Sequence, residues 1–298
     1  MIRSGYRSIA VEWRGQRESD NVEDRRGLPI GRTAVVGGGI GTVVLALVYL
    51  LLGGDPRDVL EGIQQQPAAG TVPDGTAPAY RESASEREAR QFVAVVLAGT
   101  EDVWRAEFQS RGAEYSDPHL VLYSGEVASA CGEAAAAMGP FYCPGDRRVF
   151  LDLSFFGELA SRFGAPGEFA RAYVIAHEIG HHVQNLLGVS ARVHAAEQRT
   201  GTAGANALSV RLELQADCLA GVWANRSQSA LKLSAADIDA ALRAASAVGD
   251  DRLQRAAQGY VTPDSFTHGT AAQRARWFRR GVEAGGLDAC DTFRAHEL

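Results

Sequence analysis

The spacing of apolar residues along the chain predicts a protein built mainly from helices. Apolar residues three or four positions apart recur in seven segments, at 85–97, 100–108, 168–188, 209–223, 234–248, 251–258 and 271–283. Several segments begin with a residue that can cap free backbone N–H groups, namely Ser85, Thr100, Ser209 and, in a capping box with Asp237, Ser234. Two stretches, 119–123 and 147–153, have the composition of strands. We therefore expect an α+β fold, with a small sheet beside a mostly helical body.

The N-terminal part of the chain does not follow this pattern. Residues 1–33, here called the N-terminal arm, mix arginines with acidic residues and lack apolar periodicity, which predicts a disordered or peripheral segment. The uncharged apolar run 34–52 is long enough to cross a bilayer as one helix, which takes roughly 20 residues. A cleaved signal peptide is the rival interpretation, but the long charged leader disfavours it. Residues 53–81 indicate a flexible linker, so that one globular domain spans 82–298.

Charge indicates the orientation of the chain and the class of its partners. Arg25, Arg26 and Arg32 precede the apolar run, whereas mainly acidic residues follow it. Because positive charge is retained in the cytoplasm, we expect a cytoplasmic N-terminus and an extracytoplasmic globular domain. The net charge of −6 argues against a nucleic-acid partner.

The segment His177–Glu178–Ile179–Gly180–His181 carries the strongest chemical signal. Residues four positions apart lie on one face of a helix, so both imidazoles can reach the same metal ion. Glu178 is then placed to take a proton from a water molecule, as in metallopeptidases with the H-E-x-x-H pattern. Gly167 before the motif and Gly188 after it mark the ends of a helix in which this geometry holds. The competing interpretation is a buried helix with a hydrogen-bonded histidine pair.

A third metal ligand is expected from the helix at 209–223. Glu213 and Asp217 are one turn apart on a stretch that is otherwise nearly apolar, where buried carboxylates need partners. One carboxylate completes a His2Glu zinc site and leaves a fourth position for water. We expect Glu213 to be this ligand, with one zinc ion per chain, and Asp217 to accept the other ring N–H of His177. The alternative is that both are surface acids.

Four cysteines predict two disulfides in an extracytoplasmic domain, and three pairings are available. Cys131 with Cys143 is favoured because this pair closes a loop between the two strand-like segments. Cys218 with Cys290 then attaches the C-terminal tail to the helix that carries Glu213. A role for Cys218 as a zinc ligand is disfavoured, since it lies about 140° around that helix from Glu213.

Further segments accompany the H-E-x-x-H motif and the E-x-x-x-D pair, at 13–26, 139–144, 176–184, 213–218, 249–254, 263–270 and 290–293. With these segments, nearly the whole chain resembles the bacterial family of "putative neutral zinc metallopeptidases", and its metal motif is similar to that of gluzincins. The resemblance implies a zincin-like fold and hydrolysis of peptide bonds. It also implies a strand at the sheet edge, before the zinc helix, that pairs with extended substrate, for which Val149–Leu153 is the candidate. A plain core strand is the alternative for that segment.

Together, these observations predict a membrane-anchored zinc peptidase of the bacterial cell membrane. Its partners would be a peptide or protein substrate and, through 34–52, the lipid bilayer. A zinc-stabilised envelope scaffold and a tethered protein that binds peptides without cutting them are the two alternatives. The glutamate directly after the first histidine disfavours both, because neither needs a general base.

Three further histidines and one tyrosine have separate predicted roles. His268 and Tyr260 are the candidates for stabilising the oxyanion that forms on the attacked carbonyl. His182 points about 100° away from His181 and suits a packing or surface role. His194 has no predicted chemistry.

Overall fold

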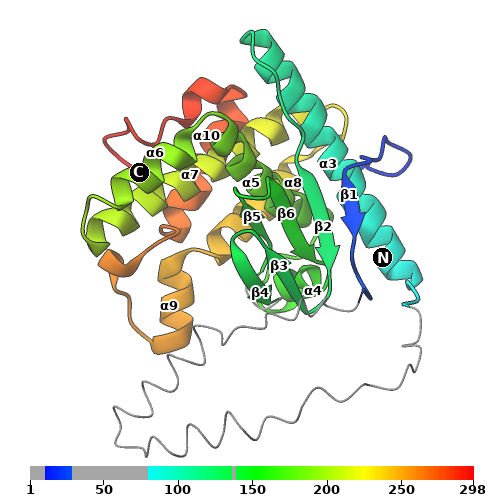
Figure 1. Cartoon of the computed structure of the whole chain (residues 1–298), viewed down its shortest axis with the longest axis horizontal. Coiled ribbons are helices and arrows are strands. Elements are labelled where there is room, and N and C mark those ends of the chain that lie inside the picture. Colours follow the sequence, from blue (N-terminus) through cyan, green and yellow to red (C-terminus); the bar gives the residue numbers. More distant parts are fainter. Residues whose placement is uncertain (1–10, 29–79, 136–138) are drawn as a thin grey trace, which may run out of the picture. The chain divides into compact units, whose positions relative to one another are not determined.

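The computed structural model describes residues 11–28, 80–135 and 139–298. In this part of the chain the fold is mostly helical α+β, with a four-stranded and a two-stranded sheet (Figure 1). The elements in chain order are β1 (Val22–Asp24), α3 (Ala84–Ser110), β2 (His119–Tyr123), β3 (Glu126–Ser129), β4 (Gly132–Ala135), β5 (Phe141–Cys143), β6 (Arg148–Asp152), α4 (Phe155–Ser161), α5 (Glu168–Leu186), α6 (Val189–Glu197), α7 (Thr202–Ser227), α8 (Ala235–Ala247), α9 (Asp250–Gln258), η2 (Pro263–Ser265), α10 (Ala271–Ala284) and η3 (Leu287–Cys290).

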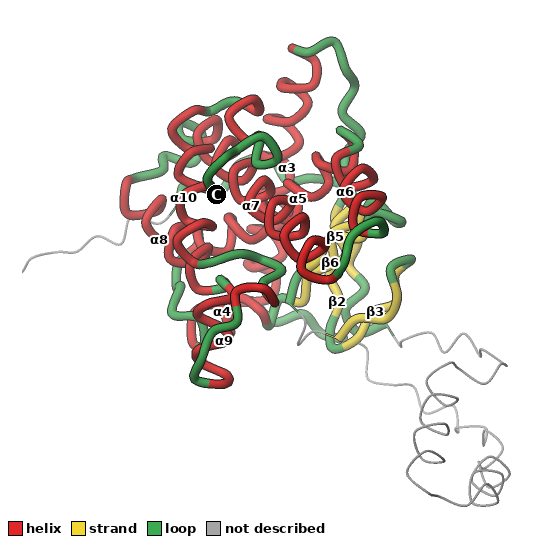
Figure 2. Tube along the Cα trace, turned by 90° about the vertical axis from the view of Figure 1, so that its left-hand side faces the viewer, coloured by secondary structure: helices red, strands yellow, loops and turns green. Residues whose placement is uncertain are grey.

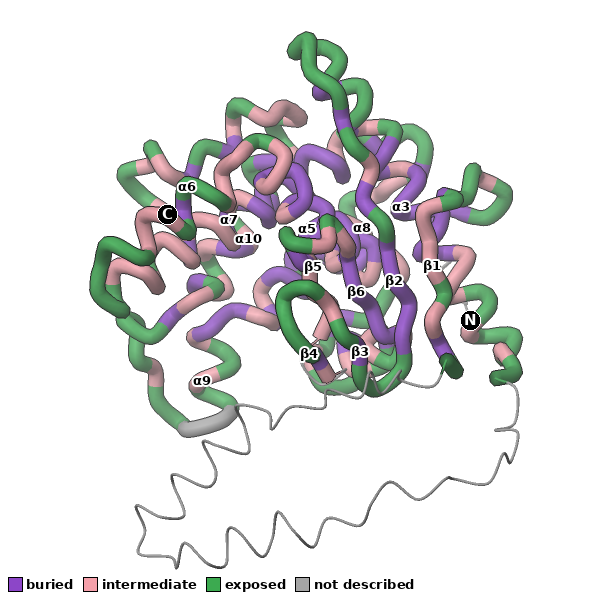
Figure 3. The backbone as a smooth tube through the Cα atoms, viewed as in Figure 1, coloured by how far each residue is buried: buried purple, intermediate pink, exposed green. Residues whose placement is uncertain are grey.

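Alternation along the strands explains why the four-stranded sheet has two apolar faces. Its strand order is β1–β2–β6–β5, with β1, β2 and β6 parallel and β5 antiparallel to β6. One set of alternate residues joins the main core on the helical side, namely Leu120, Leu122, Val149 and Leu151. The other set joins a smaller cluster with the β3–β4 hairpin, namely Val121, Tyr123 and Phe150. Figure 3 shows the resulting burial of β2, β6 and α5.

Helix α5 lies between the sheet and the helices α7 and α10 (Figures 1 and 2). It begins after Gly167 and ends before Gly188, both with positive φ, as the sequence predicts. Gly180 allows α7 to come close, since a Cβ at this position would lie 3.0 Å from the carbonyl oxygen of Ala216. The two helices therefore meet at the level of the H-E-x-x-H motif, which allows a side chain on α7 to reach both histidines.

Two helix boundaries differ from the prediction. Residues 84–110 form the single helix α3, capped by Ser83 in a capping box with Glu86. Thr100 lies inside it, with its hydroxyl donating to the Leu97 carbonyl, and therefore caps nothing. Helix α7 likewise begins at Thr202, and the Ser209 hydroxyl donates to the carbonyl of Thr267. The predicted capping box of Ser234 with Asp237 at the start of α8 is confirmed. Helix α10, predicted at 271–283, also begins with a capping box, formed by Thr270 and Gln273.

The predicted edge strand is wrong. Strand β6 (Arg148–Asp152), which overlaps the candidate Val149–Leu153, lies inside the sheet, between β2 and β5, as the alternative of a core strand predicts. Its backbone is already paired on both sides, so it cannot accept another strand. Among the described strands, β5 forms the edge on the side of α5, and the sequence analysis missed it because it has only three residues.

The prediction of a disordered or peripheral N-terminal arm is wrong for residues 11–26. Strand β1 pairs with β2 in parallel, with Val22 opposite Leu120. Trp13 is buried in the main core, and its indole N–H donates to the carboxylate of Glu168 (2.9 Å) in the first turn of α5. The contact joins residues 155 positions apart, a separation that no local pattern reveals.

The chain divides into two compact units, one of Met1–Arg26 with Glu82–Leu298 and the other of Gly27–Arg81. The apolar run 34–52, predicted to cross a membrane, and nearly all of the linker 53–81 lie outside the described residues. Within the described ranges, no helix has both the length and the apolar character that a membrane span requires.

Both predicted disulfides are confirmed. Cys131–Cys143 joins the β3–β4 hairpin to the edge strand β5. Cys218–Cys290 joins α7 to the η3 turn near the C-terminus. Cys218 is thereby used in a covalent bond, in agreement with its exclusion as a metal ligand.

Candidate metal centre

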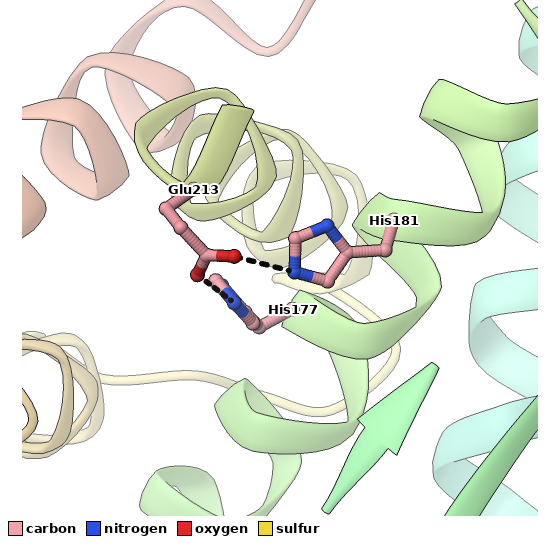
Figure 4. A group of neighbouring side chains, drawn as sticks. All are labelled: His177, His181 and Glu213. Carbon is pink, nitrogen blue, oxygen red and sulfur yellow. Dashed lines mark ion pairs between the residues drawn. The ribbon is translucent and has the colours of Figure 1, made fainter. Parts of the chain in front are cut away.

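Three side chains from two helices converge on one point. The Nε2 atoms of His177 and His181, both on α5, lie 3.3 Å from the two carboxylate oxygens of Glu213 on α7 (Figure 4). The three residues each offer a ligand atom, and these atoms all lie within 4.8 Å of one another. The three predicted ligands are therefore brought together by the fold.

The spacing of these atoms fits a tetrahedral metal ion. Ligand atoms about 2.1 Å from zinc in a tetrahedral site are about 3.4 Å from one another. Each histidine Nε2 lies 3.3 Å from one of the two oxygens of Glu213, close to this value. Two imidazole nitrogens and one carboxylate are also a donor set typical of catalytic zinc. The residues present thus fit the ion.

Asp217 fixes the orientation of His177 from behind. Its carboxylate accepts the Nδ1–H of His177 (2.9 Å), the hydroxyl of Tyr173 and two N–H groups of Arg274, from Nε (2.8 Å) and Nη2 (2.9 Å). A carboxylate has about four acceptor sites, so this group is fully used. Because the Nδ1–H is used in this hydrogen bond, Nε2 is the nitrogen of His177 that faces Glu213 and can bind a metal ion. The predicted contact between Asp217 and His177 is present.

Arg274 is a member of this network that the sequence analysis missed. It lies on α10 and is buried, as is Asp217. The two helices approach closely because glycines face each other: a Cβ at Gly221 on α7 or at Gly281 on α10 would collide with the opposite backbone. A bidentate arginine beside a buried carboxylate keeps the carboxylate ionised. No sequence signal around Arg274 indicates this role.

Gln184 fixes the orientation of His181, as Asp217 does for His177. The Nδ1–H of His181 donates to Oε1 of Gln184 (2.9 Å), and the amide of Gln184 donates to the carbonyl of Leu212 on α7 (2.7 Å). Gln184 is buried and stands three residues after His181, on the same face of α5. The i, i+3 spacing is a signal that could have identified it. Both histidines therefore have a buried acceptor that fixes which nitrogen faces the centre.

The electrostatics of the centre favour a cation. Burial opposes the charged form of His177, but the carboxylates of Asp217 and Glu213 outweigh it and raise the pKa of His177 to about 10. Burial would likewise raise the pKa of Glu213, yet the two histidines hold it well below its usual value. Positive charge is thus stabilised between these side chains, which is the condition for binding a divalent ion.

Glu178 lies beside the three ligands and is buried. Burial raises the pKa of its carboxyl above the ordinary value, although the neighbouring histidines act in the opposite direction. A carboxyl group with a raised pKa can both accept and return a proton near neutral pH.

A cavity of about 560 Å³ opens onto this centre. Its lining includes Glu178, the three ligand side chains and Arg274. The edge strand contributes Phe141 and Tyr142 to the lining, and α9 contributes Leu253. The centre is therefore accessible from a space large enough for several side chains of a peptide.

His268 also lines this cavity, as the sequence analysis anticipated. Its Nδ1 lies 3.2 Å from the carboxylate of Asp250, which also accepts backbone N–H groups from Thr267, His268 and Gly269. The hydrogen bond to Asp250 raises the pKa of His268, against the effect of burial. Asp250 was missed, since nothing in the sequence places it against the loop before α10. Tyr260, the other candidate, is 64% exposed and is not part of the cavity lining.

His182 and His194 have no part in the centre. His182 is buried, with Nε2 donating to the Ser116 carbonyl (2.6 Å) and Nδ1 accepting from the Tyr142 hydroxyl (3.0 Å). Its role is packing, one of the two predicted. His194 is exposed on α6, 3.8 Å from Glu197.

Comparisons with known proteins agree with this centre. A family model described as "Putative neutral zinc metallopeptidase" matches residues 11–293. "Uncharacterized protein YpfJ" of Escherichia coli (strain K12) is 45% identical over 293 residues, which cover 95% of this chain and 99% of that protein. "Uncharacterized protein Mb2605" of Mycobacterium bovis is 42% identical over 262 residues, which cover 84% of this chain and 86% of that protein. No solved structure is significantly similar to the chain.

Proposed function

The chain belongs to the family described as "Putative neutral zinc metallopeptidase", and from this premise we propose that it is a zinc-dependent peptidase. The observation that carries the proposal is the convergence of His177, His181 and Glu213 at a cavity, with Glu178 beside them. A purely structural zinc site is normally closed by four protein ligands, whereas a catalytic site has three and leaves a position open. The three described ligands and the adjoining cavity favour the catalytic kind.

In the proposed mechanism, His177 and His181 hold the zinc ion through Nε2 and Glu213 holds it through its carboxylate. The ion, when bound, lowers the pKa of water and polarises the carbonyl group that is attacked. Glu178 accepts a proton from the attacking water on its carboxylate and then donates it to the nitrogen of the leaving amine. The raised pKa of Glu178 suits the second half of this exchange, in which the carboxyl acts as an acid.

His268 is the proposed donor to the oxyanion. Asp250 accepts the Nδ1–H of His268, so that in the protonated imidazole the Nε2–H is left to donate toward the cavity. A donor in this place is worth about 10²-fold or more in turnover in enzymes that stabilise an oxyanion. Tyr260 has no place in the proposal, because it does not line the cavity.

Substrate is proposed to bind as an extended segment along β5. This strand is antiparallel to β6, and within the described residues no strand pairs with its outer edge. Its residues Phe141 and Tyr142 line the cavity that contains the metal ligands. Pairing through the backbone would hold a peptide beside Glu178 with little dependence on its side chains.

We propose that the domain acts outside the cytoplasm and contacts the lipid bilayer through the apolar run 34–52. The two disulfides support an oxidising compartment, since disulfides are rare in reducing cytosol. The apolar run has the length and composition of a lipid-embedded segment.

The proposal is tested with a mixed peptide library and the full chain loaded with one equivalent of zinc. We expect cleavage by the loaded protein, loss of cleavage after chelation, and recovery when zinc is restored. His181→Gln should lose both zinc and cleavage. His194→Gln is the matched control, because it removes an exposed histidine outside the centre, and it should cleave normally.

Two results would contradict the peptidase. One is cleavage that persists after chelation and in His181→Gln, which would assign the activity to another site or a contaminant. The other is stoichiometric zinc binding without cleavage of any peptide, accompanied by a large loss of stability on chelation. That second result would favour the zinc-stabilised scaffold.

A further inference from the structure

Part of the cavity lining is apolar. Phe155 and Phe163, near the two ends of α4, have ring centroids 6.2 Å apart, and both are partly exposed to the cavity. Val174, Val248 and Leu253 line the cavity as well. We call these five residues the apolar wall. Leu253 is 38% exposed, so its side chain is available to a ligand in the cavity.

The apolar wall lies directly next to the proposed chemistry. Val174 is on α5, one helical turn before Glu178 and on the same face, so the wall begins beside the general base. Gly139, which precedes β5, allows Phe155 to approach the strand, since a Cβ there would lie 3.4 Å from its ring. A peptide extended along β5 would therefore have one side chain next to the scissile bond directed at this wall.

Several charged groups around the cavity have partners within the protein. Arg162 lies 3.8 Å from Glu158, the two side chains being one turn apart on the surface of α4 and its end. Arg274 is bound to Asp217. The carboxylate of Glu213 faces the two histidines. The guanidinium of Arg162 also lies over the ring of Phe163, 5.5 Å from its centroid, at the rim of the apolar wall. Burying an unpaired charge against the apolar side chains themselves would be costly.

We propose that the substrate is a peptide segment with a large apolar side chain, aromatic or leucine-like, at the residue adjacent to the scissile bond. This inference rests on the proposed function and specifies its substrate class. Burial of such a side chain against Phe155, Phe163 and Leu253 removes apolar surface from water on both partners. Aspartate or lysine at the same position would lose hydration against these apolar side chains, at a cost in binding free energy.

The experiment uses peptides that are identical except at one residue, which is Phe, Leu, Ala, Asp or Lys, on either side of the cleaved bond. We expect kcat/KM for Phe or Leu to exceed that for Asp or Lys by roughly 10²-fold, a ratio typical of an apolar pocket. Equal rates for all five peptides, or a preference for a charged residue, would overturn the proposal.

A variant that introduces a charge tests whether the substrate side chain binds at the apolar wall. Leu253→Asp places a carboxylate in the wall and should lower kcat/KM for the Phe peptide while raising it for the Lys peptide. Because Leu253 is already partly exposed, the variant should fold. Leu187→Asp is the matched control: Leu187 is 37% exposed at the end of α5 and outside the cavity lining, so its selectivity should equal that of the parent.

Peptide binding distinguishes failure of the proposed substrate preference from failure of the proposed peptidase activity. The Kd values of the same peptides are measured with zinc-loaded Glu178→Gln by fluorescence anisotropy. Suppose that nothing is cleaved, that the Phe peptide binds more tightly than the Asp peptide, and that Leu253→Asp abolishes this difference. The proposed substrate preference is then supported, and the proposed peptidase activity is contradicted. If the Kd values are equal, the proposed substrate preference is contradicted, whether or not the protein cleaves peptides.

A second inference comes from the two ends of the segment 27–81. Before it, β1 pairs with β2, and the backbone N–H of Ser19 donates to the Ala94 carbonyl (3.0 Å) in α3. After it, Glu82 forms an ion pair with the buried guanidinium of Arg26 (2.8 Å). The chain thus leaves the compact unit and returns to it at one place. A single bilayer crossing by 34–52 would instead put the arm and the domain on opposite sides.

We therefore also propose that both flanks of the apolar run lie on the same side of the membrane. The residues 53–81 contain no second apolar run that could carry the chain back, but do contain Arg57, Asp58 and Glu61. The charges around the apolar run predict a cytoplasmic arm. The packing of β1 and Trp13 into the domain instead favours an arm on the same side of the membrane as the domain.

Cysteine labelling in intact cells tests this arrangement with the full chain. Glu18→Cys and Arg199→Cys place a thiol on an exposed position of the arm and of the domain, respectively. A membrane-impermeant maleimide should label both or neither in intact cells, and both after lysis. Labelling of one and protection of the other in intact cells would overturn the inference and restore the single crossing.

Discussion

The cavity of this protein has two contrasting sides. On the metal side, polar side chains that are buried or half-buried come from α5, α7 and α10, and the orientation of both histidines is fixed by hydrogen bonds. Asp217 is fully buried and accepts four hydrogen bonds. On the other side, the apolar wall consists of partly exposed residues from α4, α5 and α9 and from the residue after α8. The first side is held rigidly for chemistry, whereas the second presents surface that only a ligand would cover.

The difference teaches where substitutions should affect stability and where they should affect selectivity. Removing one partner from a buried charge pair leaves the other unpaired in the protein interior, and this destabilises the fold. Removing an apolar side chain that already faces water costs the folded state little. The two sides should therefore respond in opposite ways to mutation.

The largest effect is expected for the Asp217–Arg274 pair. Arg274→Met should lower the free energy of unfolding by about 3–5 kcal/mol, because Asp217 is left buried without its counter-ion. Asp217→Asn should weaken zinc binding by roughly 10–100-fold through loss of orientation of His177. Urea denaturation of the metal-free protein and zinc titration measure the two quantities. Arg279→Met, at an exposed arginine on the same helix, is the control. If Arg274→Met loses no more unfolding free energy than Arg279→Met, the contrast between the two sides is contradicted.

His268 should have the next largest effect, on turnover. His268→Gln is expected to lower kcat about 10²-fold with little change in zinc content, since it touches no predicted ligand. The hydrogen bond to Asp250 raises the pKa of His268, so the protonated donor is present below that pKa and is lost as pH rises through it. The wild-type rate should therefore decline on the alkaline side.

The pH profile of kcat distinguishes this role from a structural one. In Asp250→Asn the pKa of His268 loses the interaction that raises it, so the alkaline decline should move to lower pH. In His268→Gln the decline due to this group should be absent. An unchanged profile in both variants would exclude His268 as the oxyanion donor.

The smallest effect on stability is expected in the apolar wall. Leu253→Ser should change the free energy of unfolding by no more than about 0.5 kcal/mol, because the side chain is already partly exposed. Its kcat/KM for peptides with a large apolar residue should nevertheless fall. Denaturation and peptide kinetics on one preparation measure both, and destabilisation comparable to that of Arg274→Met would show that the wall is part of the core.

The sequence predicted the features that depend on local geometry. His177 and His181 share a helix face by their spacing, and Glu213 and Asp217 share another, so the fold had only to bring α5 and α7 together. Both disulfides followed from the order of segments along the chain. The strands 119–123 and 147–153 were recognisable because they are buried on both faces.

The features that were missed depend on contacts between distant segments. Arg274 reaches Asp217, 57 residues away, because two glycines allow α7 and α10 to touch. Strand β5 has three residues, too few for a periodic pattern, and its place is set by pairing with β6. Trp13 lies in a segment rich in charge, and its burial depends on partners in α3 and α5. Such contacts follow from the packing of the whole domain.

The central claim, that zinc and Glu178 act together on a peptide bond, is tested most directly by Glu178→Gln. Zinc per chain and kcat are measured on the same preparation, with the parent protein beside it. The account predicts one zinc ion per chain in both proteins and a loss of turnover of roughly 10²–10⁴-fold in the variant. Equal turnover in the two proteins, with zinc bound in both, would contradict it.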